Sequence, residues 1–388
     1  MMREFLSLTE EQRAVQQMAR EFAADAIAPY AAEWDRAGTY EPTLLPRLAE
    51  LGFLGMTIPV EYDGLGLDSV TYLLALEEIA AADASTAVLL SVHNSLPTQM
   101  LLAQGTREQR ERFLRPMARG AMLGAFALSE PDAGSDAAAL STQAVPTRDG
   151  RGYVLNGTKA WVTNGNRAGV ILAMARTDRT DDRRGAKGIS AFIVTPDLPG
   201  FHVGRVEDKM GLRASPTVQL TFDNLQVPAD RLLGELGGGL TYALSSLDQG
   251  RLGIATQALG IARSALAHSV RYAGERRQFG QPIRAHGAIQ AKLADMATRL
   301  SQARALTYAA AAAKDRGEPI TQLGAMAKLA ASETAMWVTT QAVQIFGGYG
   351  YVTDYPVERL FRDAKVTEIY EGTSEIQRIV IGRALYED

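Results

Sequence analysis

The sequence predicts an α+β multidomain protein with an N-terminal α-helical domain, a middle β-sheet or β-barrel domain and a C-terminal antiparallel four-helix bundle. Three observations predict this order. Apolar residues recur at helical spacing in the first part of the chain, short β-branched runs rich in turn residues fill the middle, and long alanine-rich stretches with short breaks follow. We place the domains at residues 1–120, 121–233 and 234–388, which suits a chain of 388 residues.

The composition excludes several classes of chemistry. The chain has no cysteine, which rules out disulfides, thiolate nucleophiles and cysteine-based zinc sites. Its four histidines lie far apart in the sequence, so we expect no metal site. A net charge of −4 without an unbroken basic run argues against nucleic-acid binding. No apolar stretch approaches the ~18 to 20 residues that span a bilayer, and the N-terminus does not resemble a leader, so we expect a cytoplasmic protein with no membrane insertion.

The first domain shows helical spacing and a helix start signal. Val15, Met18 and Phe22 fall on one face of a helix, Thr9 is a candidate N-cap followed by acidic residues, and Pro29 ends the pattern. Further helices are expected over residues 68–82, 85–103 and 107–118.

The middle domain has the signature of strands. Asn156-Gly157 stands between two apolar runs, a pattern that predicts a tight hairpin turn. Val218, Leu220 and Phe222 alternate with polar residues, as expected of a half-buried strand. Compact apolar runs of strand length occupy residues 170–174 and 191–194.

The last domain returns to long helices. Apolar residues at i, i+4, i+7 and i+11 form one stripe, and alanine is abundant, which favours helix and close helix packing. The stripe consists of Ile289, Leu293, Met296 and Leu300. Because the breaks between the helical stretches are short, we expect antiparallel neighbours in a bundle.

The segment 368–378 places a carboxylate just before the final helix. Thr373 or Ser374 can cap this helix, and Ser374 would form a capping box with Gln377. Glu371 then lies in the preceding turn, where apolar neighbours would desolvate its carboxylate, raise its pKa and make it a stronger base. The competing interpretation is a surface glutamate favoured by the helix dipole.

Three other segments have both a structural and a ligand-binding interpretation. The small residues and hydroxyls of 127–136 form either a capped turn or a site of close backbone approach to a ligand. Trp161 to Asn164 ends a predicted strand as a core residue and turn, or supplies an aromatic wall and a hydroxyl. The glycines of 344–351 end a long helix or meet an extended ligand. No G-x-G-x-x-G or Walker A sequence is present, so a Rossmann nucleotide fold is not expected.

Taken together, these segments resemble one known family. SEPDAGSD, WVTNG, DQGR, ERRQFG, QIFGGYGY and IYEGTSEIQR occur in this order, and this ordered set is similar to that of the acyl-CoA dehydrogenases. The three-domain layout is also similar, so the resemblance covers nearly the whole chain. It implies an FAD-dependent α,β-dehydrogenation of an acyl-CoA to a trans-2-enoyl-CoA, with Glu371 removing the α-proton and flavin N5 taking the β-hydride.

The resemblance also implies roles for individual residues. Glu371 matches the catalytic base; some members carry the base at the position of Gly250, where a glycine cannot serve. The positions that match FAD contacts are Phe126, Leu128, Ser129, Gly134, Ser135, Trp161, Val162, Thr163, Arg276, Phe279, Gln344, Ile345, Gly347, Gly348, Thr373, Ser374 and Glu375. The positions that match contacts to the CoA thioester are Ser135, Asp248, Arg251, Tyr370 and Gly372.

Partners and specificity follow from the same resemblance. Arg276, Phe279 and residues 344–348 match positions that reach the FAD of a neighbouring subunit, which implies a homotetramer built as a dimer of dimers. The implied electron acceptor is an electron-transfer flavoprotein. Residues 92–96 resemble the short-chain branch, so we expect a butyryl-like or short branched acyl group, with medium-chain specificity as an alternative. Gly287 stands where the family usually has glutamine, which puts one adenine-side contact in doubt.

Two competing functions make different predictions. An acyl-CoA oxidase on the same scaffold would pass electrons directly to oxygen and reoxidise rapidly in air. A non-catalytic, acyl-CoA-binding helical scaffold would be colourless, or yellow without bleaching by any acyl-CoA.

Overall fold

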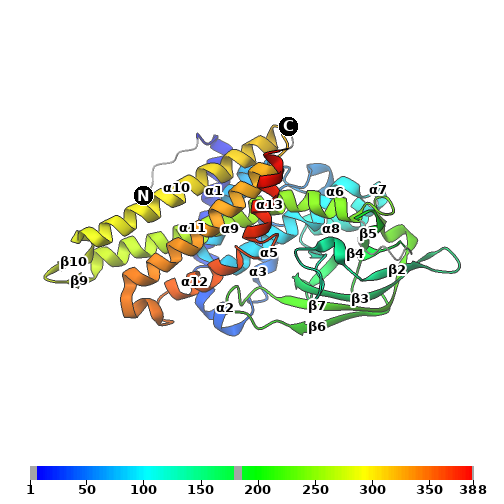
Figure 1. Cartoon of the computed structure of the whole chain (residues 1–388), viewed down its shortest axis with the longest axis horizontal. Coiled ribbons are helices and arrows are strands. Elements are labelled where there is room, and N and C mark those ends of the chain that lie inside the picture. Colours follow the sequence, from blue (N-terminus) through cyan, green and yellow to red (C-terminus); the bar gives the residue numbers. More distant parts are fainter. Residues whose placement is uncertain (1–6, 179–185, 387–388) are drawn as a thin grey trace.

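The computed structural model describes residues 7–178 and 186–386 and has three consecutive blocks, helical, β and helical (Figure 1). The helices of the first and last blocks pack side by side, and the β-sheet lies at one end of this helical body (Figure 1). The predicted fold class is confirmed.

The first block is built from helices. A capping box starts the first of them: Gln12 N donates to Thr9 Oγ1 and Thr9 N donates to Gln12 Oε1, both at 3.1 Å. Phe22 is buried, and Val15 and Met18 pack against the same core. The segments are α1 (Glu10–Ala26), α2 (Ala31–Ala37), α3 (Leu44–Glu50), η1 (Val60–Tyr62), α4 (Ser69–Ala82), α5 (Ala84–Ser95), α6 (Pro97–Gln104), α7 (Arg107–Gln109), η2 (Arg110–Leu114) and α8 (Arg115–Ala118).

The prediction of one helix over residues 85–103 was wrong in detail. Pro97, which has no backbone N–H to continue the hydrogen bonding, begins the new helix α6. In α5, His93 is buried, with Nε2 2.9 Å from the Leu54 carbonyl oxygen and Nδ1 accepting from Gly124 N at 2.9 Å. Burial lowers the pKa of His93 to about 4. This neutral histidine links the first block to the sheet.

The middle block is one mixed sheet with the strand order β6-β7-β3-β2-β4-β5-β8, and β1 pairs in parallel with β4. Its segments are β1 (Leu123–Ala127), η3 (Ala137–Ala139), β2 (Gln143–Pro146), β3 (Gly152–Thr163), β4 (Ala168–Arg176), η4 (Ala186–Gly188), β5 (Ile189–Val194), β6 (Phe201–Val206), β7 (Thr217–Pro228), η5 (Ala229–Arg231) and β8 (Leu232–Leu233).

Strands β4 and β5 are buried on both faces. Val170 and Leu172 pack with residues of α6 and α8, whereas Ile171 and Ala173 pack with Phe222 of β7. This burial on two sides explains why the sequence has continuous apolar runs here, while β7 alternates as predicted.

The hairpin predicted at Asn156-Gly157 was wrong. Strand β3 runs straight through these residues, and Asn156 pairs with Gln143 of β2. Gly157 has φ 152°, and a Cβ built on it would lie 2.4 Å from Thr142 Oγ1, so the glycine serves close strand approach at a β-bulge. The turn that joins β2 to β3 spans residues 147–152 instead.

Up to residue 386, where the described part of the chain ends, the last block contains three long helices and two short ones. Its segments are α9 (Gly239–Glu275), β9 (Arg277–Gln278), β10 (Gln281–Pro282), η6 (Ile283–Ala285), α10 (Gly287–Asp315), α11 (Thr321–Phe346), η7 (Gly347–Tyr351), α12 (Val357–Val366) and α13 (Ser374–Ala384). Helices α9, α10 and α11 lie side by side, and α12 and α13 pack on α11 (Figure 1). The predicted stripe on α10 faces the core, with Met296 and Leu300 buried. Since α4 and α5 pack against α9, the two helical blocks share one core.

Candidate functional site

Glu371 lies in the turn between α12 and α13, and its backbone is in the left-handed region. Glu371 has φ 52° and Gly372 has φ 91°. Thr373 is the N-cap of α13, with its Oγ1 accepting from Ile376 N at 3.3 Å. The alternative, a capping box formed by Ser374, is therefore wrong, because Thr373 occupies the N-cap position and Ser374 is already the first residue of the helix.

The side chain of Gln377 holds this turn from within the final helix. Its Nε2 donates to the Glu371 carbonyl oxygen at 3.2 Å and to the Gly372 carbonyl oxygen at 2.8 Å. A Cβ built on Gly372 would lie 2.6 Å from Gln377 Nε2. This position therefore needs glycine for two reasons: its φ is positive, and there is no room for a side chain. The turn is thus fixed on both sides of the base.

The carboxylate of Glu371 is removed from water. The residue as a whole is half-buried, but both carboxylate oxygens are inaccessible and have no hydrogen-bond partner among the described residues. Burial raises the pKa of Glu371 to about 7, although Lys328 and Arg251 oppose the rise. The surface-glutamate interpretation does not fit this environment.

Gly250 makes room for this carboxylate. A Cβ built on Gly250 would lie 2.2 Å from Glu371 Oε2 and 3.1 Å from Leu96 Cδ2. At Gly250, helix α9 therefore contacts the Glu371 carboxylate with its backbone and without a side chain. Any side chain at position 250 would occupy the space of the Glu371 carboxylate.

Polar residues of α9 lie near the base. Arg251 is buried, pairs with Asp248 at 2.5 Å, and its Nε has no hydrogen-bond partner among the described residues. Thr321 Oγ1 donates to the other oxygen of Asp248 at 2.7 Å. Tyr370 donates to Gln257 Oε1. Of the residues predicted to touch substrate, Asp248, Arg251, Tyr370 and Gly372 thus come from α9 and from the turn before α13.

The segments expected to contact a flavin ring meet at β3. Ala160 N donates to the Ser129 carbonyl oxygen at 2.9 Å, and a buried ion pair joins Lys159 Nζ to Glu130 Oε1 at 2.7 Å. These contacts hold residues 126–135 alongside the strand that carries Trp161. Within this group, Leu128 and Val162 are buried, Phe126, Ser129 and Thr163 are half-buried, and Gly134 and Ser135 are exposed.

Trp161 has an unusual position for a large aromatic side chain. It lies at a β-bulge of β3 with φ 61°, and 64% of it is exposed. A tryptophan held in the left-handed region and exposed to solvent does not contribute to the core, and such outliers suggest a functional role. The alternative interpretation, in which Trp161 is a residue of the hydrophobic core, is wrong.

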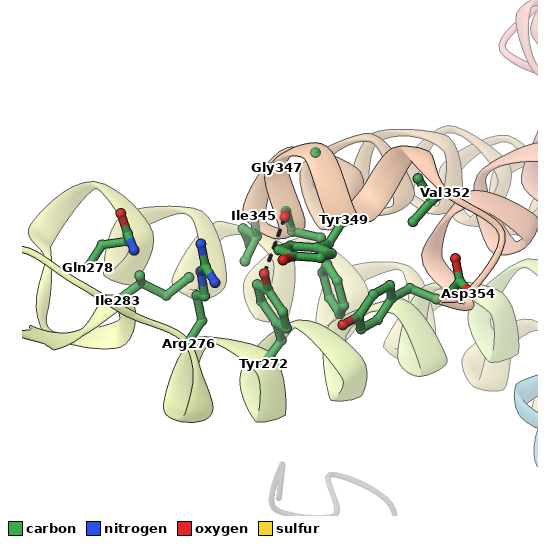
Figure 2. A pocket seen from close by; sticks show the side chains of 12 residues that line it. Tyr272, Arg276, Gln278, Ile283, Ile345, Gly347, Tyr349, Val352 and Asp354 are labelled. Carbon is green, nitrogen blue, oxygen red and sulfur yellow. Dashed lines mark hydrogen bonds between the residues drawn. The ribbon is translucent and has the colours of Figure 1, made fainter.

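A cavity of about 820 Å³ lies between the end of α9 and the end of α11 (Figure 2). Arg276, the residue directly after α9, lines it on one side, and Ile345, Gly347 and Gly348 line it from α11 and η7. Glu371 is not part of its lining. Four aromatic side chains complete the wall: Tyr272, Phe346, Tyr349 and Tyr355.

The aromatic wall orients Arg276. The Arg276 guanidinium lies 5.4 Å from the centre of the Tyr349 ring. The rings of Tyr272 and Phe346 are stacked, with their centres 4.0 Å apart. The predicted residues Phe279, 93% exposed, and Gln344, also exposed, lie outside the lining. The structure therefore brings together only part of this predicted group.

The remaining candidates lie at or near helix starts. Ser374 is buried with an unpartnered Oγ among the described residues, and Glu375 is exposed. Gly287 is the first residue of α10, and a Cβ built on it meets nothing within 4 Å.

Neither a membrane span nor a metal cluster is found in the described part of the chain. Among residues 7–178 and 186–386, every helix is too short or too polar to cross a bilayer. The same residues contain no group of three or more histidine, aspartate and glutamate side chains placed to hold a metal ion.

Three domain models of one family match the chain along its length. They describe the acyl-CoA dehydrogenase N-terminal domain over residues 9–121, the middle domain over residues 125–225 and the C-terminal domain over residues 237–386. The chain belongs to the acyl-CoA dehydrogenase family. It is accordingly an oxidoreductase, as the resemblance implied.

Individual relatives are similar over almost the whole chain. The mitochondrial short-chain specific acyl-CoA dehydrogenase of Mus musculus is 49% identical over 376 residues, which cover 97% of this chain and 90% of the relative. The structure of butyryl-CoA dehydrogenase from Megasphaera elsdenii has a TM-score of 0.95 at 45% identity, covering 99% of this chain and 100% of that chain. A chain in the structure described as electron transferring flavoprotein of Acidaminococcus fermentans has a TM-score of 0.96 at 47% identity, with coverages of 99% and 100%.

Sequence reasoning missed several residues of these sites. Tyr272 precedes Arg276 by one helical turn, and this i, i+4 spacing was an available signal. Lys328 gave no local signal, because it reaches the turn of the base only through helix packing.

Proposed function

We propose that this protein removes the α-proton and the β-hydride of a short-chain acyl-CoA, with Glu371 as the base and FAD as the cofactor, and gives a trans-2-enoyl-CoA. The single observation that carries the proposal is the Glu371 carboxylate, whose oxygens are buried and unpartnered beside the bare backbone of Gly250. A buried acceptor without a donor is costly unless a ligand uses it.

The environment of Glu371 suits proton abstraction near neutral pH. A thioester α-proton is weakly acidic, and a base with a pKa near 7 is about half ionised at neutral pH and is a stronger base than an ordinary glutamate. The exclusion of water keeps the carboxylate reactive, and the fixed turn holds it in one place. Glu371 would retain the α-proton after the transfer.

Polar groups on two elements would hold the thioester. Arg251 has an unused Nε, and its pairing with Asp248 orients the guanidinium beside the base. In the family, the backbone N–H of the base residue polarises the thioester carbonyl as charge develops on it. The fixed turn of Glu371 and Gly372 would present that N–H in a constant direction.

The residues present fit FAD at two places. Trp161 offers an exposed indole face, with the hydroxyls of Thr163 and Ser129 on the neighbouring segments. The cavity at Arg276 combines a guanidinium, which suits a phosphate group, with aromatic and glycine residues that suit a flat ring. When bound, FAD would supply the hydride acceptor that the chain itself lacks.

The distance along α9 between the base and the Arg276 cavity supports a site shared between subunits. The Arg276 cavity lies at the far end of α9, whereas the start of α9 is next to the sheet (Figure 1). Gly250, which meets the Glu371 carboxylate, precedes Arg276 by 26 residues, which is about 39 Å along the helix. One FAD would therefore contact Trp161 of one chain and Arg276 of another, in line with a homotetramer.

Replacing Arg276 tests this assignment. We expect Arg276→Ala to lose about tenfold or more in FAD affinity, because a charge-assisted contact to a phosphate contributes roughly 1.5–3 kcal/mol. The flavin-to-protein absorbance ratio after gel filtration measures the loss. Arg271→Ala, an exposed arginine one turn earlier on α9, is the control and should keep its flavin. Equal flavin content in both variants would refute the role of Arg276.

A short acyl chain is supported by the side chains next to the base. Leu96 lies where Gly250 and Glu371 meet, and the Tyr370–Gln257 contact occupies space beside the same turn. The relatives named short-chain specific and butyryl-CoA dehydrogenase support the same class.

An anaerobic bleaching series tests the function directly. We expect butyryl-CoA to bleach the yellow protein on the order of tenfold faster than octanoyl-CoA, since a tight pocket rejects added methylenes. Stopped-flow absorbance of the flavin measures both rates. A faster C8 reaction would overturn the short-chain assignment, and no bleaching by any acyl-CoA would overturn the function.

The proposed electron acceptor is an electron-transfer flavoprotein. The similarity to a chain in a structure described as an electron transferring flavoprotein supports this partner. Slow reoxidation of the reduced protein in air would agree with it, whereas rapid reoxidation would point to an oxidase.

A further inference from the structure

A lysine lies buried beneath the Glu371–Gly372 turn. Lys328 belongs to α11, is 0% exposed, and its ammonium donates a 2.8 Å hydrogen bond to the Gly372 carbonyl oxygen. Among the described residues no ion pair within 4.0 Å is found for it. Because a buried lysine ordinarily requires a paired carboxylate, its position needs an explanation.

The hydrogen bond acts on a strained turn. Glu371 has φ 52°, a region that non-glycine residues avoid, and Gly372 follows with φ 91°. The Gly372 carbonyl oxygen accepts from both Lys328 Nζ and Gln377 Nε2, each at 2.8 Å. Two side chains from different helices therefore hold the carbonyl that directly follows the base.

The charge of Lys328 also acts on the base. Burial lowers the pKa of Lys328 to about 8, and Glu371 is the strongest of the charges that oppose this lowering. In return, Lys328 is the strongest charge that opposes the raised pKa of Glu371, ahead of Arg251. The two side chains therefore interact electrostatically without a direct ion pair.

The other charged or titratable groups around this pair come from the remaining elements. Arg251 approaches from α9, and its positive charge lowers the pKa of both Lys328 and Glu371. Tyr72 approaches from α4 and Tyr370 directly precedes the base, and the pKa of each is raised by burial and then by Glu371. Glu368 and Glu375 lie on either side of the turn. Their negative charges raise the pKa of Lys328 but do not act on that of Glu371.

We propose that Lys328 is a positioning residue for the base, whose ammonium fixes the Glu371–Gly372 turn through the Gly372 carbonyl and whose positive charge keeps the Glu371 carboxylate ionised. The proposal rests on the proposed function, in which Glu371 removes the proton. It assigns to α11 a part in catalysis without any contact to the reacting atoms. The two contributions, one geometric and one electrostatic, have different consequences and can be separated.

Removing the charge should move the pH dependence of the reaction. In Lys328→Met the carboxylate loses its main opposing charge, so its pKa rises further and a larger fraction is protonated at neutral pH. We expect the acidic limb of the bleaching rate with butyryl-CoA to move to higher pH by on the order of one unit. The rate should therefore fall more at pH 6 than at pH 9. Lys328→Arg, which keeps the charge and a donor, should leave the limb near its wild-type position.

Gln377→Met is the matched control. It removes a donor to the same carbonyl, and to the neighbouring Glu371 carbonyl, without removing a charge. We expect a lower rate with an unshifted limb. If Lys328→Met lowers the rate in the same way and leaves the limb unchanged, Lys328 acts only on geometry and the electrostatic part of the proposal fails. Should Lys328→Met not fold, Lys328→Gln, which keeps an amide donor without charge, carries the same expected shift.

A second readout does not depend on turnover. The carboxyl infrared band that is lost in Glu371→Gln reports the protonation of Glu371, and its midpoint should move to higher pH in Lys328→Met. An unmoved midpoint would overturn the electrostatic role. Failure of the proposed function would look different, because Glu371→Gln would then remain active while the Lys328 variants were irrelevant to the rate.

Discussion

Glu371→Gln is expected to lower the rate of flavin reduction by about 10³-fold, because a positioned general base contributes roughly 10²–10⁴-fold. The amide has nearly the shape of the carboxylate but cannot accept the α-proton. Since both carboxylate oxygens lack hydrogen-bond partners among the described residues, the exchange breaks no hydrogen bond of the folded chain. FAD content and thermal stability should therefore remain close to wild type, or rise in the case of stability, because an amide does not ionise when buried.

The measurement is anaerobic stopped-flow reduction by butyryl-CoA with flavin content determined on the same sample. Glu333→Gln, a surface glutamate paired with Arg378 at 2.5 Å, is the control for the loss of one carboxylate. It should react at the wild-type rate. A Glu371→Gln protein with near-normal turnover would exclude residue 371 as the base.

Gly250→Ala is expected to slow the reaction by about 10²-fold while the protein remains folded. Its Cβ would lie 2.2 Å from Glu371 Oε2, which is the end of a flexible side chain, so the carboxylate moves and the helix stays. Displacing a catalytic group by about 1 Å costs on the order of 10²-fold. An alanine in the interior of α9 should also favour the helix by roughly 0.5–1 kcal/mol.

This combination of lower activity and equal or higher stability identifies the effect as local. The matched control is Gly382→Ala in α13, where a Cβ meets nothing within 4 Å. Rate and free energy of unfolding, measured on both variants, separate the two sites. Unchanged bleaching by Gly250→Ala would show that the Glu371 carboxylate does not need the space beside α9.

The sequence was sufficient for the elements that depend on local patterns. The N-cap at Thr9 and the apolar stripe that includes Met296 and Leu300 appear in the structure as predicted. The Asn156-Gly157 hairpin failed because tertiary packing decided the use of this glycine, which meets Thr142 of the neighbouring chain segment. A turn motif in sequence does not distinguish close strand approach from chain reversal.

The candidate site was predictable in part for the same reason. The family motifs identify Glu371, and its position before a capped helix follows from the local sequence. Its environment does not, because Gly250, Leu96 and Lys328 come from helices far apart in the chain. The burial that raises the pKa of the base is therefore a product of helix packing.

The pH dependence of anaerobic flavin reduction by butyryl-CoA tests the central claim most directly. The base acts as a carboxylate and its pKa is raised to about 7, so the rate should fall as the pH drops through about 7 and reach a plateau above it. In Glu371→Gln the residual rate should lack this limb. A wild-type limb near pH 4.5, the ordinary value of a solvated glutamate, or the same limb in Glu371→Gln, would contradict a desolvated Glu371 as the base.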